Sequence, residues 1–390
     1  MDTNLSLNLS TLSKELRLIL DIMKMKSSDS IELTKKEMFT DIDWELFLQI
    51  SMHHRVYPII YSKLKIIDSN LVPPYVFQIL NREYKKNTFQ MLQLSGEMEQ
   101  ISKLFIENQI QLLFLKGPVI AYDIYGDISL RTSKDLDILI PISKLEKAEE
   151  LLLNFGYERV EETTILNEVK WRGYHLAYFN PQKNVELEIH WRLQPLPSQE
   201  PNFNELWERK RGSSLTSYPV YYLGKEDLIL YLVSHGSRHG WFRLRWLLDI
   251  DYLLGKGLDL EKASKILNKY SSYHLLGQTL ILVSELLKTP INKELQIFTE
   301  EYRSKKLAQS AVFFINQLVP LNTIMSSTVF KRYIISLRSS NFQKFIYIVL
   351  LSYPSSVDAN TLRLPKPLHF LYFPLRPLLW IWRKTKIPQK

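Results

Sequence analysis

A strand-like hexapeptide of sequence DLDILI, residues 135–140, constrains the fold of this chain more than any other segment. Side chains alternate between the two faces of a strand, so Asp135 and Asp137 project from one face while apolar residues pack behind them. Two neighbouring carboxylates repel each other when both are ionised, whereas a hard divalent cation such as Mg²⁺ or Mn²⁺ prefers oxygen ligands of this kind. The hexapeptide therefore predicts a buried strand that carries a divalent-cation site.

The residues on either side of the hexapeptide predict a small sheet with interspersed helices. A turn at Gly117 ends an apolar strand, and Gly156 ends a helix that has an apolar stripe. The later segment NVELEIHW alternates polar and apolar residues, which places Glu186, Glu188 and His190 on one face of a second strand. The predicted order is strand, helix, strand, helix and hairpin, over residues 110–115, 119–125, 136–140, 143–153 and 169–191.

Helical periodicity dominates both flanks of this sheet. Helices are predicted over residues 11–25, from residue 43 with a bend at Pro58, and over 75–107, where the helix should pack across the back of the sheet. From Gly224 onward the pattern is helical. The fold class is therefore α+β, with a small mixed β-sheet core, N-terminal helices and a C-terminal all-helical domain. The predicted boundaries are 1–108 for the N-terminal helical segment, 109–223 for the sheet core, 224–366 for the helical domain and 367–390 for an aromatic and basic tail.

The composition is that of a globular protein without disulfides. Of 390 residues, 45% are hydrophobic and none is cysteine, which excludes disulfide frameworks and thiolate metal sites. The N-terminus lacks the pattern of a secretion signal, and no apolar run reaches the ~20 residues that a membrane span needs. We therefore expect a cytoplasmic protein. The net charge of +9 favours an anionic partner without choosing among nucleotides, nucleic acids and anionic membranes.

The segment 368–386 is rich in aromatic and basic residues and is interrupted by Pro374 and Pro377. Trp380 and Trp382, followed by a basic cluster, suit the headgroup region of a bilayer, which would hold the protein peripherally at the inner face of the membrane. Alternatively, the segment is an arm that packs its aromatic side chains on the helical domain. The sequence favours this second interpretation and leaves the first open.

The order and spacing of these motifs resemble the nucleotidyltransferase fold of the DNA polymerase beta superfamily, and in particular the uncharacterised nucleotidyltransferase family of bacteria. The resemblance covers about residues 40–255. It is carried by Leu115-Lys116-Gly117, Tyr125, Arg131, Asp135-Leu136-Asp137-Ile138-Leu139, Gly156-Tyr157, Glu188-Ile189-His190-Trp191, His235, His239, Trp241, Leu244 and Asp249.

The resemblance implies an enzyme that transfers a nucleotidyl group, or a nucleotide-linked sugar, to a hydroxyl or phosphate acceptor such as a modified peptide or a glycan. A two-magnesium mechanism is expected, because phosphoryl transfer depends mainly on positioning and charge neutralisation. Asp135 and Asp137 would hold both ions. Glu188, or failing that Glu186, would complete the metal site and accept the proton of the acceptor hydroxyl.

Phosphate binding is assigned to the turn between the first strand and the following helix. The backbone N–H groups at Gly117 would receive the nucleotide phosphates, because a residue without Cβ allows close approach. Lys116, Arg131 and Lys134 are nearby cations that would pair with the phosphates. Pro118 follows Gly117 where the superfamily has a serine.

Three histidines are candidates for the site. His190 would orient the acceptor, act as a base, or hydrogen-bond to the metal ligands. His235 and His239 stand four residues apart, on one face of a continuous helix. This spacing suits a zinc site, a lining of the nucleotide or acceptor pocket, or plain packing, and the resemblance favours the pocket, with His239 as a nucleotide-binding residue.

A second class of function stays open from the sequence, namely a non-catalytic regulator that binds a nucleotide or nucleic acid, as in a toxin and antitoxin pair. The basic residues are scattered rather than gathered in a stripe with interleaved aromatics, so nucleic acid is the less favoured partner. The presence of all three predicted carboxylates, Asp135, Asp137 and Glu188, favours an enzyme over such a regulator.

Overall fold

A seven-stranded mixed sheet forms the centre of the protein in a computed structural model, which describes residues 7–25, 37–66, 71–160, 173–270, 272–354 and 356–386. The strand order is β3-β4-β5-β2-β1-β7-β6. The strands are β1 Leu113–Phe114, β2 Asp135–Leu139, β3 Glu158–Arg159, β4 His175–Asn180, β5 Val185–His190, β6 Arg211–Ser213 and β7 Val220–Tyr222. Part of the predicted hairpin, residues 169–172, lies outside the described residues.

The hexapeptide occupies the middle of this sheet. β2 runs parallel to β5 and antiparallel to β1, while β4 and β5 form the predicted antiparallel hairpin. Leu136 and Ile138 are fully buried, as are Leu187 and Ile189 on β5. Alternation along each strand therefore gives one apolar face and one polar face, as the sequence predicts.

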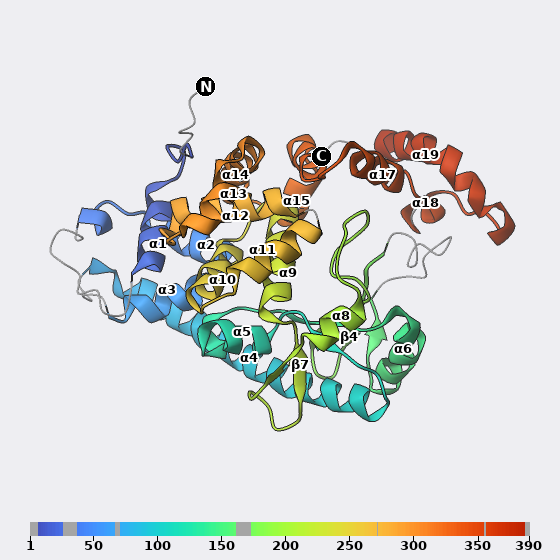
Figure 1. The fold of residues 1–390 in the computed structure, drawn as a ribbon, viewed down its shortest axis with the longest axis horizontal. Helices are drawn as coiled ribbons and strands as arrows, with labels where there is room; N and C mark the ends of the chain where they lie inside the picture. The colour runs from blue at the N-terminus through green and yellow to red at the C-terminus, as the bar shows by residue number, and fades with distance from the viewer. Residues whose placement is uncertain are drawn as a thin grey trace.

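The long helix α4, Pro74–Glu107, lies along the sheet (Figure 1). Its Ser102 hydroxyl donates to the Pro219 carbonyl before β7 at 2.6 Å. Glu97 accepts from Tyr157 at 2.8 Å and from Lys183 in the hairpin turn at 2.8 Å. These contacts tie α4 to both halves of the sheet, in agreement with the predicted packing.

The N-terminal helices are α1 Lys14–Lys24, α2 Trp44–His53 and α3 Tyr57–Leu64. The prediction of one helix bent at Pro58 is wrong, because α2 ends at His53 and Arg55 adopts a positive φ of 56°. Pro58 lies in the first turn of α3, where a missing N–H costs no helical hydrogen bond.

The C-terminal half is helical, and the α+β class predicted from the sequence is confirmed. Ser340 caps a separate helix within this half, because its side chain accepts from the Gln343 N–H at 3.1 Å. The remaining helices are α5 Pro118–Tyr125, α6 Leu145–Asn154, α8 Phe203–Glu208, α9 Lys225–Arg238, α10 Leu244–Gly255, α11 Leu260–Lys269, α12 Tyr273–Leu287, α13 Lys293–Glu300, α14 Tyr302–Ile315, α15 Leu321–Ser326, α16 Thr328–Ser336, α17 Asn341–Leu351, α18 Ser356–Thr361 and α19 Tyr372–Lys386, with short 3₁₀ helices η3 Ile128–Leu130, η4 Ile142–Lys144 and η5 Lys366–Leu371.

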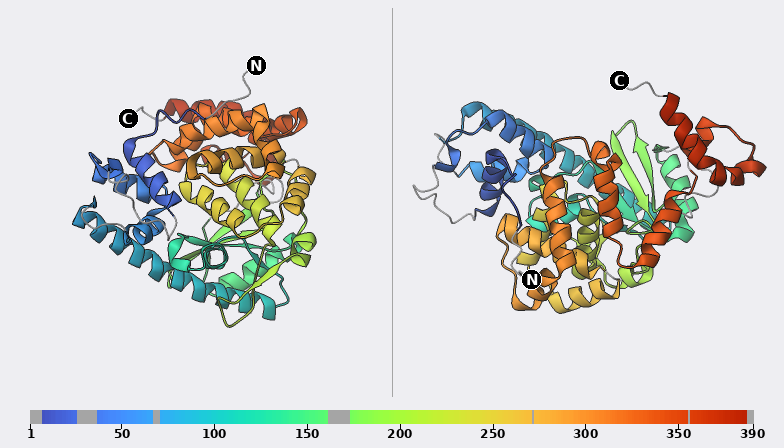
Figure 2. Two further views of the ribbon diagram at one scale, coloured as in Figure 1. Left: turned by 60° about the vertical axis from the view of Figure 1, so that its left-hand side comes forward. Right: turned by 90° about the horizontal axis from the view of Figure 1, so that it is seen from above.

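The last three α-helices, α17 to α19, form an arm that extends away from the bundle of α12 to α14 (Figures 1 and 2). Tyr372 and Leu379 form a small core of their own, separate from the main one. Trp380 and Trp382 remain 52% and 41% exposed. No described helix is long and apolar enough to span a bilayer.

Candidate functional site

The pairing of β2 with β5 places the predicted carboxylates side by side. Asp137 lies opposite Glu188, and Asp135 lies opposite Glu186. Because neighbouring strands are about 4.8 Å apart and paired residues share a face, all four acidic side chains project to the polar side of the sheet. The fold therefore gathers the two motifs that the sequence separates by some fifty residues.

Asp137 is the most enclosed of these carboxylates, with no exposed surface. Its Oδ1 accepts from Lys116 Nζ at 2.8 Å and lies 3.2 Å from His190 Nε2. Burial alone would raise the pKa of Asp137, but the charge of Lys116 and the hydrogen bond to His190 outweigh burial and hold that pKa well below its usual range. Its Oδ2 is buried without a hydrogen-bond partner among the described residues.

Asp135 differs from Asp137 in its surroundings. Burial and the negative charge of Asp137 raise the pKa of Asp135 to about 6, against a weaker opposing effect of Lys116. Glu186 shows a similar effect, because burial and the negative charge of the neighbouring Glu188 raise its pKa. The polar face therefore carries more negative charge than its own cations neutralise, and this is the electrostatic condition that favours a bound divalent cation.

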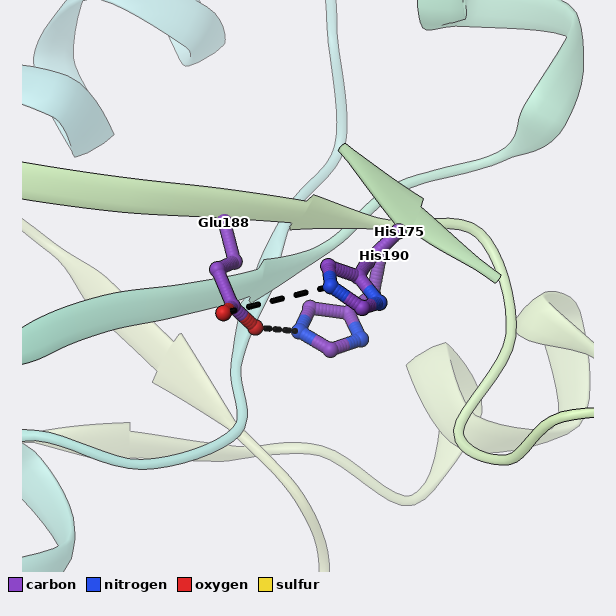
Figure 3. A group of neighbouring side chains, drawn as sticks. All are labelled: His175, Glu188 and His190. Carbon is purple, nitrogen blue, oxygen red and sulfur yellow. Dashed lines mark hydrogen bonds and ion pairs between the residues drawn. The ribbon is translucent and has the colours of Figure 1, made fainter. Parts of the chain in front are cut away.

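His175, Glu188 and His190 form a compact cluster beside Asp137 (Figure 3). Glu188 Oε2 lies 3.1 Å from His190 Nε2, and Glu188 Oε1 lies 4.0 Å from His175 Nε2. One ligand atom from each residue lies within 4.8 Å of the others, and the two imidazole rings stack with centroids 5.0 Å apart.

The two histidines of this cluster have opposite pKa shifts. Burial alone would lower the pKa of His190, but its hydrogen bonds to Asp137 and Glu188 raise it. Burial and the neighbouring charge of His190 lower the pKa of His175 to about 4. The two carboxylates thus favour the charged form of His190, while burial favours the neutral form of His175.

Sequence reasoning missed His175, although a signal for it existed. In an antiparallel hairpin the residue numbers of paired positions have a constant sum. The turn between Asn180 and Val185 closes this hairpin, and the same register pairs His175 with His190. Counting back from the turn would therefore have placed His175 beside the predicted site.

Gly117 lies where the phosphate-binding turn was predicted, at the N-terminus of α5. Its φ of 89° favours glycine, and an added Cβ would lie 3.3 Å from the Leu136 side chain. The preceding Lys116 is directed at Asp137, with its ammonium 5.7 Å from the ring centre of Tyr231 on α9. The turn thus sits tightly against β2, and α9 of the helical half faces it.

The other two predicted phosphate partners lie in different settings. Arg131 is 1% exposed, and its guanidinium donates to both oxygens of Asp249 on α10, at 2.9 and 3.0 Å. Tyr125 donates to the same carboxylate at 2.9 Å. Lys134 is exposed, directly before Asp135. The structure therefore places Lys134 at the rim of the site, whereas Arg131 forms a buried ion pair. No local sequence pattern predicts the pairing of Arg131 with Asp249.

His239 ends α9 and packs in an aromatic group with His235 and Trp246. The ring centres of the two histidines are 4.7 Å apart, and His239 Nδ1 has no hydrogen-bond partner within the described part of the chain. Burial, followed by the charge of Arg238, lowers the pKa of His239 well below its usual range. Burial likewise lowers the pKa of His235, so the fold favours the neutral form of both rings, and the charge of Lys116 acts on both of them.

The residues of the polar face fit a divalent cation. Asp137 offers an unpartnered buried oxygen, and Asp135 and Glu188 offer further carboxylate oxygens on the same face. Carboxylates are the ligands that Mg²⁺ and Mn²⁺ prefer, while the imidazoles of His175 and His190 also suit Mn²⁺ or another transition metal. The donor set therefore allows a divalent metal without fixing its identity.

Comparison with known proteins identifies the family of the chain. A family described as uncharacterised nucleotidyltransferase matches residues 40–288, well over half of the chain. No match was found among curated proteins or among solved structures. The matched region spans the sheet, the acidic cluster and the first helices of the C-terminal half. The chain therefore belongs to the uncharacterised nucleotidyltransferase family.

Proposed function

We propose that this protein is a metal-dependent enzyme that moves a nucleotidyl group, or a nucleotide-linked sugar, from a nucleotide donor to a hydroxyl or phosphate acceptor. The observation that carries the proposal is the unpartnered, buried Oδ2 of Asp137 on a face shared with Asp135 and Glu188. Leaving a buried acceptor without a partner costs free energy unless a ligand satisfies it. A divalent cation bound there supplies neutralising charge for the donor phosphates.

The protein's own residues account for charge and orientation around the donor. Lys116 neutralises Asp137 through a contact of 2.8 Å and lies beside the turn at Gly117, whose backbone faces the start of β2. Lys134 is the exposed cation closest in sequence to Asp135 and is free to reach a phosphate oxygen. Arg131 holds the loop that carries Lys134 by its ion pair with Asp249, so we assign it positioning rather than phosphate binding.

The proton of the acceptor hydroxyl goes to Glu188 in this proposal. His190 Nε2 lies within 3.2 Å of carboxylate oxygens of both Asp137 and Glu188, so this nitrogen must carry a proton and donate. A nitrogen that already donates cannot accept the acceptor's proton. Glu188 keeps 22% of its side chain exposed and can meet an incoming hydroxyl, which leaves His190 to orient the two carboxylates.

The proposed acceptor is a peptide, glycan or small molecule, and a nucleic acid is less favoured. The test incubates the full chain with Mg²⁺ or Mn²⁺, each labelled nucleotide or nucleotide sugar, and candidate acceptors, and reads the mass gained by the acceptor. A gain of one nucleotidyl group would indicate nucleotidyl transfer, whereas a gain of one hexose would indicate sugar transfer. We expect Asp135→Asn and Asp137→Asn each to abolish the gain. Full turnover by either variant would contradict the proposal, and tight nucleotide binding without any turnover would favour a regulator.

A further inference from the structure

A small cavity lies between the segment that follows β5 and the C-terminal helices. Its volume is about 40 Å³, which is room for a few water molecules or one carboxylate or phosphate group. Gln194 lines it from the segment after β5, Ser234 and Arg238 line it from α9, and Arg338 lines it from the turn after α16.

Four polar groups in this lining have buried atoms with no hydrogen-bond partner among the residues that the structure describes. They are Gln194 Nε2, Ser234 Oγ, Arg238 Nη1 and Arg338 Nε. The side chains of Gln194, Ser234 and Arg338 are 7%, 2% and 9% exposed, so these groups are withdrawn from bulk water. Every one of the four can donate a hydrogen bond, and buried donors are normally satisfied. The cavity thus has the lining of a site for a hydrogen-bond acceptor.

The charged side chains that line the cavity have one sign. Two arginines line it, and the described lining contains no aspartate or glutamate. Burial lowers the pKa of Arg338, Tyr347 opposes this shift, and the charge of Arg238 makes a smaller contribution that also lowers the pKa. The nearby Glu200 carboxylate is occupied, because its oxygens accept from the backbone N–H groups of Leu193 and Gln194 at 3.0 and 2.8 Å. An anion in the cavity would relieve the repulsion between the two guanidinium groups.

Arg238 connects the cavity to the acidic cluster. Its guanidinium lies 5.0 Å from the ring centre of Tyr174, and that ring lies 4.3 Å from the ring of His175. Nη2 of the same arginine is 3.4 Å from His235 Nδ1. A molecule anchored in the cavity by an anionic group would therefore lie beside the residues that we assign to transfer.

We propose that this cavity binds the carboxylate or phosphate group of the acceptor, so that the acceptor is an anionic molecule whose nucleophile faces the acidic cluster. The donors of Arg338, Arg238, Ser234 and Gln194 hold the anion. Anion binding by the cavity is independent of catalysis, whereas the identity of the bound molecule as the acceptor rests on the function proposed above.

The test measures the binding of inorganic phosphate and of acetate to the full chain by titration calorimetry, with no metal and no nucleotide present. We expect saturable binding of at least one anion, and the two titrations distinguish a phosphate site from a carboxylate site. Arg338→Gln should weaken binding about tenfold or more, because it removes a charge-assisted hydrogen bond. Arg332→Gln, which changes an exposed arginine on α16, should bind like the parent protein.

Two further variants keep the result decisive. Ser234→Ala removes one donor without a charge change and should weaken binding even if Arg338→Gln does not fold. Glu149→Gln, at a carboxylate that pairs with Arg159 and does not line the cavity, should retain the affinity, and a loss of affinity in this variant would contradict the cavity as the anion site. Absence of binding for both anions, or the affinity of the parent protein in both Arg338→Gln and Ser234→Ala, would also overturn the proposal. Anion binding without any group transfer would support the cavity and contradict the function proposed above.

Discussion

At the scale of single residues, the site is an excess of carboxylates that a few cations hold in place. Asp137 pairs with Lys116, and the pair is buried, with 0% and 15% of the side chains exposed. Within the described part of the chain Asp135 has no such direct partner, and burial and the repulsion of Asp137 raise its pKa to about 6. The protein itself therefore stabilises the charged form of Asp137, whereas the charge of Asp135 depends on what binds beside it.

Lys116→Met should strongly destabilise the protein. It leaves the Asp137 charge buried without its ammonium partner, and breaking a buried ion pair in this way costs on the order of 3 kcal/mol or more. Chemical denaturation measures the loss in the free energy of unfolding. The matched control is Lys134→Met, an exposed lysine for which a change within about 0.5 kcal/mol is expected. Equal stability of the two variants would show that the Lys116 contact is not maintained in solution.

The two glutamates of β5 should differ sharply when transfer is measured. Glu188→Gln should lower kcat about 10²-fold or more, because it removes the group that accepts the proton next to His190. Glu186→Gln keeps the same change of charge two residues away and should retain most of the activity. The reverse order of activities would assign the third carboxylate to Glu186.

At the scale of secondary-structure elements, the site depends on register more than on any one motif. The polar face of β5 was readable from its alternation, and the hairpin turn fixes which residue of β4 meets His190. The contact between Arg131 and Asp249 joins residues more than a hundred positions apart, and no local pattern encodes such a pair. The break between α2 and α3 was missed because apolar periodicity continues across it while Arg55 leaves the helical conformation.

The helix α12 carries a histidine that should make stability depend on pH. Burial lowers the pKa of His274 from its ordinary value of 6.5 to about 4, while its Nε2 donates to the Leu337 carbonyl at 2.7 Å. Between these pH values the unfolded chain binds a proton that the folded chain does not. The free energy of unfolding should therefore fall as the pH drops from about 6.5 to about 4, by roughly 3 kcal/mol from this group.

Denaturation curves at pH 7, 5.5 and 4.5 measure this dependence. In His274→Gln, which keeps a donor for the Leu337 carbonyl and cannot titrate, the fall should be smaller. Some dependence should persist, because burial also lowers the pKa values of His53 and His54. The same pH dependence in the parent protein and in His274→Gln would contradict the assignment to this residue.

At the scale of the whole molecule, the sheet core and the helical half enclose the site, while the arm of α17 to α19 stands apart (Figure 2). Periodicity in the sequence predicted the fold class, while the resemblance to nucleotidyltransferases implied that the acidic residues of β2 and β5 lie together. The sequence left two interpretations of the tail, because the exposure of its aromatic side chains depends on which surfaces meet in the fold.

The segment 341–386 contains seven lysines and arginines against one aspartate. Its exposed apolar side chains include Phe342, Phe345, Ile348, Val349, Phe370, Phe373, Leu378 and Ile381.

Contact of the arm with an anionic membrane surface stays a prediction from the sequence, and vesicle binding tests it. The full chain should bind vesicles that contain phosphatidylglycerol more tightly than neutral vesicles, and salt should weaken the binding. The double variant Phe370→Ser, Leu378→Ser should reduce co-sedimentation about tenfold. Phe89→Ser, which alters an exposed phenylalanine on α4, should not. Equal binding of the parent protein, the double variant and Phe89→Ser would contradict membrane contact by the arm, as would a lack of binding to anionic vesicles. Either result would favour a protein partner that contacts the arm.

The most direct test of the proposed metal site is a titration of the full chain with Mn²⁺. The signal of free Mn²⁺ is followed by electron paramagnetic resonance. The parent protein should bind the ion, and Asp137→Asn and Asp135→Asn should each weaken binding about tenfold or more, since each removes an anionic oxygen ligand. Glu149→Gln, at a carboxylate paired with Arg159 away from the cluster, should bind as the parent does. Binding of equal strength in the parent and in Asp137→Asn would contradict the claim that these carboxylates hold the metal.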